Sequence, residues 1–181
     1  MLMMNKEDAL SLLQQYGPEP HMVQHALSSE AIMRALARHY NEDEELWGLA
    51  GLLHDVDYPL TKEQPAEHGL KAMEILAGKL PREVLEAIGA HNSECNGANP
   101  SSRLDYALRC AETITGLVSA AALMRPTGMD GMQVKSLKKK MKDKAFAANV
   151  SRERIRECEH MGMSLDDFLG LAIAALTPQL S

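Results

Sequence analysis

Gly51-Leu52-Leu53-His54-Asp55-Val56-Asp57-Tyr58 is the stretch that decides the fold, because a histidine and an aspartate stand side by side where an apolar run ends. Adjacent residues on a helix point about 100° apart, so two neighbours reach one point in space only near a helix end or kink. A metal ion that both side chains bind is a natural reason for such a pair. Imidazole with carboxylate suits Mn, Fe, Co, Ni or Zn, and the carboxylate also suits Mg. The pair alone is a weak signal, and its weight depends on the rest of the chain.

The composition predicts one soluble globular unit. The chain has 181 residues, of which 45% are apolar and 24% are charged, enough for one well-packed domain with little room for two. The formal net charge of −6 argues against a general nucleic-acid binder or membrane-surface binder. We therefore expect neither a nucleic-acid nor a membrane partner, and the oligomeric state stays open.

The cysteines and the start of the chain indicate a cytoplasmic protein. Cys95, Cys110 and Cys158 form no CxxC pair, so we interpret them as free thiols in a reducing compartment. The first eight residues lack the basic start and apolar core of a signal peptide. The wholly apolar runs are also too short to span a bilayer.

Apolar residues recur at helical spacing, and no strand-length run alternates β-branched residues. We expect helices at about 20–40, from about 43 to the His54-Asp55 pair, from Pro65, after Pro81, at about 103–124, and after Ser151 and Ser164. The helix before His54 is apolar over so much of its circumference that it should be central in the core. The sequence therefore predicts an all-α fold.

Several polar residues lie on or at the end of these apolar faces. His25 shares a face with apolar residues of its helix, His91 ends another buried face, and Glu112 lies on the shoulder of the 103–124 helix. For any single histidine, a core residue with one hydrogen-bond partner is the simpler interpretation. Together with His54 and Asp55, however, they come from four helices, and bundle cores build metal sites in this way. An ion-free version would bury carboxylates and imidazoles together, which is costly.

Two further acidic or basic residues are less certain members of this set. His68 stands in the first turn of the helix expected from Pro65, so its side chain could face either the pocket or solvent. Asp105 is about 10 Å from Glu112 along the helix axis, so only one of these two carboxylates can reach a given ion.

The ordered set resembles the HD-domain superfamily of metal-dependent phosphohydrolases. The signature segment around His54-Asp55, the helix of His25, the Glu67-His68-Gly69 segment and the segment ending in His91-Asn92 all resemble family positions. Segments around Glu112, at Arg125-Pro126, at 144–147 and at 152–155 resemble a small stand-alone bacterial subgroup. The match covers about residues 20 to 175.

The resemblance implies a single-domain helical bundle over residues 1–181. Within it, the metal-binding HD core covers 20–125, and a C-terminal helical extension at 126–181 packs on that core. The family normally ends its metal set with aspartate, whereas this chain has Glu112, whose carboxylate sits one methylene further out.

The resemblance also implies a mechanism with one or two divalent ions. One ion would lie on His25, His54, Asp55 and Glu112, and a second on Asp55, His68 and His91, with Asp55 as the bridge. An activated water would attack phosphorus, with Asp57 or Asn92 orienting that water. The catalytic residues would thus be Asp55, Asp57 and Asn92.

The expected substrate is a small phosphate ester, with a nucleotide as one option. Six lysines stand between 135 and 144, and such a run is usually a solvated face. In the alternative interpretation, Arg125 and lysines such as Lys139 and Lys140 bind the substrate phosphate. Two other functions stay open: a non-catalytic metal-binding or ligand-binding module, suggested by Glu112, and a di-iron oxygenase, because the superfamily has oxygenase members.

Overall fold

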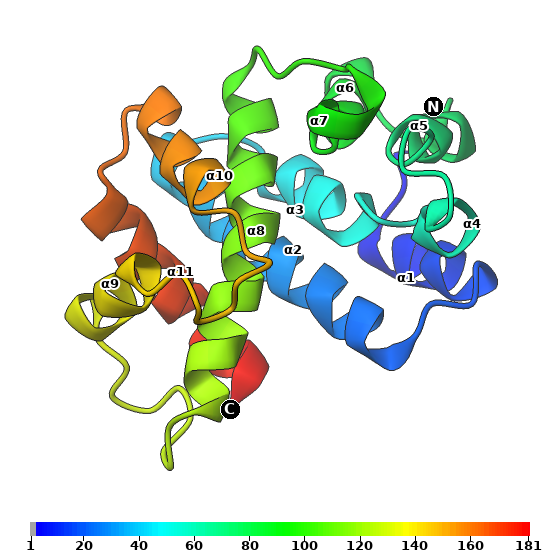
Figure 1. Cartoon of the computed structure of the whole chain (residues 1–181). Helices are drawn as coiled ribbons and strands as arrows, with labels where there is room; N and C mark the ends of the chain where they lie inside the picture. The colour runs from blue at the N-terminus through cyan, green and yellow to red at the C-terminus, as the bar shows by residue number, and fades with distance from the viewer. Residues whose placement is uncertain (1–2) are drawn as a thin grey trace.

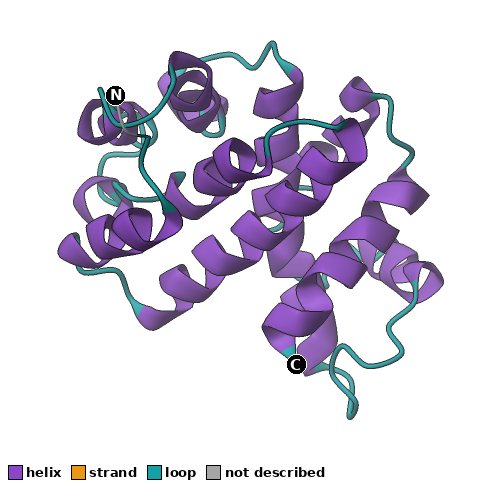
Figure 2. Ribbon diagram, turned by 180° about the vertical axis from the view of Figure 1, so that it is seen from behind, coloured by secondary structure: helices purple, strands orange, loops and turns teal. Residues whose placement is uncertain are grey.

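The computed structural model describes residues 3–181, and within that range every regular element is a helix (Figures 1 and 2). Met1 and Leu2, which begin the segment expected not to be a signal peptide, lie outside the described residues. The prediction of an all-α fold is confirmed. The elements are α1 (Lys6–Gln15), α2 (Pro20–Tyr40), α3 (Glu44–Leu53), α4 (Tyr58–Thr61), α5 (Leu70–Leu76), α6 (Arg82–Ala90), α7 (Ser93–Asn96), α8 (Arg103–Leu123), α9 (Val134–Lys142), α10 (Arg152–Arg156), the 3₁₀ helix η1 (Glu157–Met161) and α11 (Leu165–Leu180).

The two longest helices, α2 and α8, begin and end at residues that suit helix termini. Pro20 is the first residue of α2, where its missing N–H costs nothing, and Asn41 ends that helix with a left-handed φ of 57°. Ser102 and Asp105 form a capping box at the start of α8. Asp105 therefore serves the helix terminus, and its carboxylate accepts the N–H groups of Ser101 and Ser102.

Helix α8 runs through the middle of the molecule (Figure 1). It contacts α2, α3 and α6, and also the C-terminal elements α9, α10, η1 and α11. Leu108, Ile114 and Leu117 on α8 are fully buried. Because one straight helix touches both groups of elements, side chains on α8 can meet residues from distant parts of the chain.

Helix α3 lies in the core, as its composition predicts. Residues 47–53 are all buried, and α3 packs along α2. The two helices approach most closely at Gly51, where an added Cβ would lie 2.8 Å from backbone atoms of Ser29 and Glu30. Only glycine allows this approach, which brings the end of α3 against α2.

The segment after α3 differs from the prediction in two places. Pro59 was also expected to end the helix before the His54-Asp55 pair, because proline is a common stop after a helix; α3 instead ends at Leu53, and Pro59 lies in the first turn of α4, where proline is tolerated. Pro65 does not begin a helix either, since α5 starts at Leu70. Gly69 directly precedes α5 with a φ of +89°, a backbone conformation that favours glycine.

Residues 126–181, the predicted extension, pack around α8: the loop before α10 crosses in front of α8, and the red end of α11 passes behind its lower end (Figure 1). Helix α11 contacts both α8 and α2, and α10 with η1 contacts α8. Phe168, Leu169 and Leu176 of α11 are fully buried. None of the helices between residues 3 and 181 combines the length and the apolar composition needed to cross a bilayer.

Candidate metal centre

His54 stands at the end of α3 and is completely buried. Its Nδ1–H donates to the carbonyl oxygen of Gly51 at 2.7 Å. His91, at the end of α6, is held in the same way by the carbonyl oxygen of Ile88. Because a carbonyl only accepts, Nδ1 carries the proton in both rings, and Nε2 of each neutral ring presents a lone pair.

His25 of α2 is oriented by Thr115 of α8. The Thr115 hydroxyl donates to the carbonyl oxygen of Glu112 at 2.7 Å, so it accepts a hydrogen bond from His25 Nδ1 at 2.9 Å. His68 is oriented by Asp57, whose Oδ1 lies 2.8 Å from His68 Nδ1. These two rings therefore also present Nε2 as a lone pair in their neutral forms.

The four Nε2 atoms converge on the carboxylate of Asp55, with two histidines at each oxygen. His25 and His54 lie 3.5 Å and 3.3 Å from Oδ2, and their own Nε2 atoms are 3.0 Å apart. His68 and His91 lie 3.0 Å and 3.3 Å from Oδ1, and their Nε2 atoms are 3.1 Å apart. The structure thus forms two three-residue groups that share Asp55.

The charges within this cluster are strongly coupled. Burial alone would raise the pKa of Asp55, but the charge of His54 and hydrogen bonds from His54, His68 and His91 hold that pKa well below its usual range. Burial opposes protonation of His54 and His68, yet the pKa of His54 is raised by Asp55, and that of His68 is raised to about 10 by Asp55 and Asp57. The pKa of His25 is lowered by burial and by the neighbouring His54.

This donor set fits a divalent metal ion. Four lone pairs and two carboxylate oxygens face one another at about 3 Å, and only cations, either protons or metal ions, can relieve their repulsion. Each histidine has its other nitrogen fixed by an oxygen atom, which is the usual arrangement around metal-binding histidines. The prediction that an ion-binding group forms around His54 and Asp55 is therefore supported by the geometry of the donors.

Glu112 lies at the edge of the cluster and stays a predicted ligand. Its Oε2 is 3.7 Å from His25 Nε2, whereas Oε1 is 3.2 Å from Nη2 of Arg154 and accepts the Thr113 hydroxyl at 2.7 Å. The close groups consist of His25, His54 and Asp55, and of Asp55, His68 and His91. The Glu112 carboxylate therefore lies between Arg154 and His25.

His68 faces the cluster and not the solvent, which decides between the two alternatives left by the sequence. Only 13% of its side chain is exposed, and it bridges Asp55 and Asp57. The inward position of the His68 side chain depends on the turn at residues 65–69. The prediction placed a helix there instead of a turn.

Asp57 and Asn92 stay predicted water-orienting residues, and in the structure both side chains bind the segment around His68. Asp57 is fully buried, and its Oδ2 accepts the N–H groups of Gly69 and Ala72 while Oδ1 binds His68. Asn92 donates to the carbonyl oxygens of Pro65 and His68. Both side chains therefore hold the turn that positions His68.

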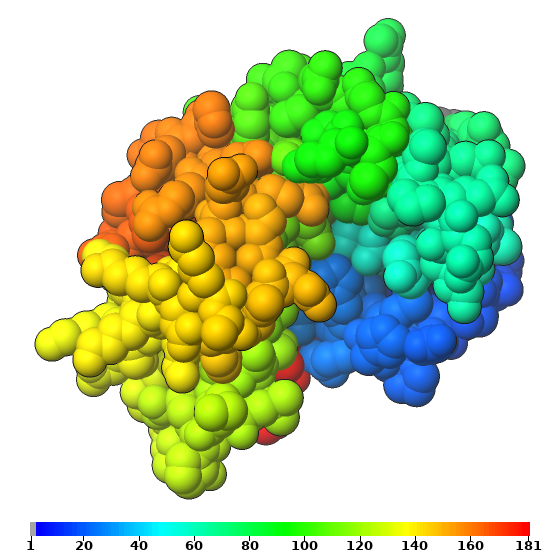
Figure 3. Space-filling view, viewed as in Figure 1, coloured from blue at the N-terminus to red at the C-terminus, as the bar shows by residue number. Residues whose placement is uncertain are grey.

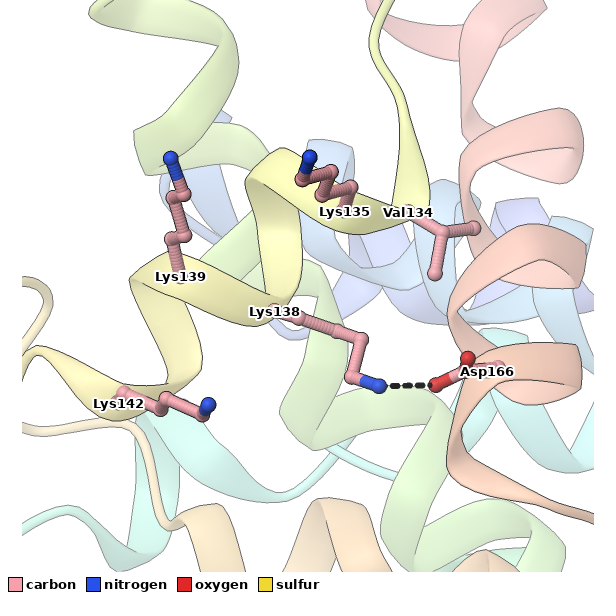
Figure 4. A pocket seen from close by; sticks show the side chains of 6 residues that line it. All are labelled: Val134, Lys135, Lys138, Lys139, Lys142 and Asp166. Atoms are coloured by element: carbon pink, nitrogen blue, oxygen red, sulfur yellow. Dashed lines mark ion pairs between the residues drawn. The ribbon is translucent and has the colours of Figure 1, made fainter.

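Arg125, Lys139 and Lys140 stay predicted phosphate ligands, and the structure shows contacts of each that lie outside the cluster. Arg125 donates to the carbonyl oxygens of Gly128 and Asp130, and it lies about 20 Å along α8 from Glu112 at 1.5 Å per residue. Lys139 lines a hollow between α9 and α11 together with other lysines of α9, and Lys138 there pairs with Asp166 (Figure 4). Lys140 stacks on Phe146. These positions agree with the simpler interpretation of the lysine run as a solvated face.

A cleft leads to the cluster from the surface. One cavity of about 240 Å³ is lined by residues that include His25, Glu112, Asn149 and Arg154, and a second of about 310 Å³ shares His25 and continues along α2. Figure 3 shows the surface hollowed between the orange segment near residue 150 and the blue start of α2. The space beside His25 is therefore reached between α2, α8 and α10.

Arg154 and Thr115 are the residues of this site that sequence reasoning missed. Arg154 belongs to a segment whose resemblance was noticed without a role, and its position beside Glu112 depends on how α10 packs on α8. Thr115 lies in the segment around Glu112 that resembles the subgroup, and the sequence assigned it no role. A polar residue one turn after Glu112 on the same helix was the signal that could have identified it.

A protein-family model described as an HD domain matches residues 22–143 of the 181-residue chain. The match includes His25, His54, Asp55 and the other predicted ligands, and it ends before α10. No curated protein and no solved structure matches the chain significantly.

Proposed function

Since this chain belongs to the HD-domain family, we propose that it is a metal-dependent phosphohydrolase that acts on a small phosphate ester. The observation that carries this proposal is the pair of histidine groups that share Asp55, one at each carboxylate oxygen. When bound, a divalent metal lowers the pKa of a water molecule and offsets charge on phosphoryl oxygens.

In this proposal, some side chains of the cluster bind the ions and others orient the histidines. His25 and His54 would hold one ion against Asp55 Oδ2, and His68 and His91 would hold a second against Oδ1. Asp57 fixes the His68 ring, and Thr115 fixes the His25 ring. Glu112 is a further predicted ligand of the first ion. Because most donors are imidazole nitrogens, Mn, Fe, Co, Ni or Zn suits the site better than Mg.

The cleft supports a small phosphorylated substrate. Its two cavities of about 240 and 310 Å³ meet at His25, so an ester could place its phosphate at the cluster and its alcohol part along α2. A nucleotide remains one option within this class. The expected setting is the cytoplasm, because the three cysteines suit a reducing compartment.

Elemental analysis of protein purified without added chelator, combined with a screen of phosphate esters, tests the proposal. The wild-type protein should contain one or two divalent ions and hydrolyse at least one ester. His54→Ala should lose both metal and hydrolysis, whereas His39→Ala, which changes an exposed histidine, should lose neither.

The two groups can be separated by further variants. His91→Ala should empty the second position and keep an ion at the first, while Asp55→Asn should empty both. Survival of metal and hydrolysis in His54→Ala would show that the site is misplaced. Bound metal without hydrolysis of any ester would favour the binding module, and bound iron with oxygen consumption would favour the oxygenase.

A further inference from the structure

The cleft contains an arginine, Arg154, that could bind an anion and that lies outside the residues matched by the HD-domain model. Arg154 lies on α10, outside residues 22–143, and lines the cavity together with His25 and Glu112. The start of α10 is fixed by Ser151, whose hydroxyl accepts the N–H of Arg154 at 3.2 Å. The guanidinium therefore lies in the cleft wall, within 3.2 Å of Glu112 Oε1.

The guanidinium of Arg154 has hydrogen-bond partners at Nη2 but none at Nε. Its Nη2 donates to the carbonyl oxygen of His91 and lies 3.2 Å from Glu112 Oε1. Its Nε is buried and has no hydrogen-bond partner within residues 3–181, since the nearest carboxylate oxygen of Glu94 is 3.7 Å away. A buried N–H without a hydrogen-bond partner is costly, so a bound water molecule or a ligand that accepts from Nε would lower the free energy.

Glu112 stands between Arg154 and the histidines. One of its oxygens faces Arg154, and the other lies 3.7 Å from His25 Nε2. A phosphate group carries up to two negative charges and can accept two parallel N–H bonds from a guanidinium. It therefore competes well with a carboxylate that offers Arg154 a single oxygen.

We propose that Arg154 is the phosphate-binding cation of the cleft and that Glu112 is its partner until the substrate phosphate arrives. The phosphate then replaces Glu112 at the guanidinium, and Glu112 turns towards His25 and the first ion. This inference rests on the proposed function, because it assigns the substrate's phosphate to the cleft beside the metal cluster.

The exchange of partners makes metal and phosphate binding cooperative. Arg154 and the first ion compete for Glu112 when phosphate is absent. Phosphate removes that competition, so it should tighten metal binding, and by linkage the metal should tighten phosphate binding to the same degree. A purely structural arginine would show no such coupling.

Titration calorimetry with Mn²⁺ and inorganic phosphate tests the proposal on the full chain. Phosphate should bind Mn²⁺-loaded Arg154→Ala roughly 10- to 100-fold more weakly than wild type, as expected for lost charge-assisted hydrogen bonds. Mn²⁺ without phosphate should bind this variant as tightly as wild type or more tightly, because Glu112 is then free. Phosphate should no longer tighten Mn²⁺ binding.

The matched control is Arg156→Ala, which removes an exposed arginine from the same helix and should change neither affinity. If the alanine variant does not fold, Arg154→Gln takes its place, because the amide can still donate to the carbonyl oxygen of His91. The same two results are expected for it. Thermal melting confirms that each variant is folded.

Unchanged phosphate affinity in the Arg154 variant would overturn the proposal. A parallel fall in Mn²⁺ affinity would also overturn it, since Arg154 would then only support His91. Because inorganic phosphate binding needs no turnover, the result is independent of hydrolysis. If the Arg154 variant loses phosphate binding while the wild type hydrolyses no ester, this inference is supported and the proposed function is contradicted. If the wild type hydrolyses an ester while the Arg154 variant keeps its phosphate affinity, the proposed function is supported and this inference is contradicted.

Discussion

At the scale of single residues, the centre depends on how each imidazole is oriented. Each of the four histidines gives its Nδ1 to an oxygen atom and its Nε2 to the space around Asp55. Asp57 is the clearest example, because its buried carboxylate joins His68 to the backbone N–H groups of Gly69 and Ala72. A hydrogen bond that fixes the other nitrogen of a histidine in this way raises the affinity of that histidine for a metal ion.

Asp57→Asn tests whether Asp57 orients His68 for metal binding. The amide removes the charge that orients His68, so the group of Asp55, His68 and His91 should bind metal roughly 10- to 100-fold more weakly. The group of His25, His54 and Asp55 should keep its ion. Metal content and titration calorimetry measure both positions. Asp130→Asn changes an exposed aspartate and serves as the control. Two ions bound at wild-type affinity would refute the assigned role.

At the scale of elements, two contacts set the position of the cluster. The first is the close approach of α3 to α2 at Gly51, which brings His54 to His25. The second is an ion-pair network across α7, α8 and η1, in which the buried Arg109 binds both Glu94 and Glu157 at 2.6 Å. The network also includes Arg154 of α10, whose Nε lies 3.7 Å from Glu94.

Gly51→Ala should weaken the packing of α3 on α2. The new Cβ would lie 2.8 Å from backbone atoms of Ser29 and Glu30, which cannot move as a flexible side chain does. We expect a loss of about 1–3 kcal/mol in the free energy of unfolding, typical of overpacking. Chemical denaturation measures this value. At Gly170 in α11 the nearest atom would be 3.6 Å away, so Gly170→Ala should be neutral or stabilising. Equal effects at both glycines would contradict the close approach.

The Glu94–Arg109 pair predicts a loss of stability in acid. Burial would raise the pKa of Glu94, but the hydrogen bond from Arg109 outweighs it and lowers that pKa to about 2. A carboxyl group whose pKa is lower in the folded protein stabilises the fold above its ordinary pKa of 4.5, and this contribution is lost as pH falls from 4.5 towards 2.

Melting temperatures measured between pH 6 and pH 2.5 check this dependence. The difference between wild type and Glu94→Gln should be largest near pH 6 and should shrink as pH falls below 4.5. Glu83→Gln, which changes an exposed glutamate on α6, should show no such trend. A constant difference over the whole range would exclude the assigned role of the Glu94 charge.

At the scale of the whole molecule, the helical packing separates a buried centre from an accessible surface. Histidines from distant parts of the chain meet in the interior, and the cleft beside α10 connects them with solvent. The same packing buries Cys110 and Cys158 completely and leaves Cys95 exposed. Burial raises the pKa of the Cys158 thiol to about 11 and that of Cys110 well above its usual range, so both stay protonated at neutral pH.

Thiol labelling measures whether the molecule packs in this way. Iodoacetamide at pH 7.5 should modify one cysteine of the native protein, Cys95, and all three after unfolding in guanidinium chloride, because the thiolate is the reactive form and needs access to the reagent. Mass spectrometry counts the adducts. Cys95→Ser should remain unlabelled while folded. Rapid native labelling of Cys110 or Cys158 would show that α8 or η1 is less well packed than described.

The sequence by itself determined the all-α class, the limits of α2 and α8, and the central place of the helix before His54. These features depend on local periodicity and on residues such as Pro20 and Ser102, whose effects act within one or two helical turns. The order of histidines and acidic residues along the chain was also enough to identify the family. Neither inference required a long-range contact.

Only the tertiary structure decided which side chains meet around Asp55 and which do not. His68 turns inward because Asp57 binds the backbone at Gly69 and Ala72, and Arg154 reaches Glu112 because α10 packs on α8. Lys139 and Lys140 have the charge for phosphate but point from α9 to other surfaces. Chemical character is a property of each residue, whereas its partners depend on packing between segments far apart in the chain. The His54-Asp55 pair could therefore be identified from the sequence as the centre of a candidate metal site, while the nearby Arg154 could not be placed there.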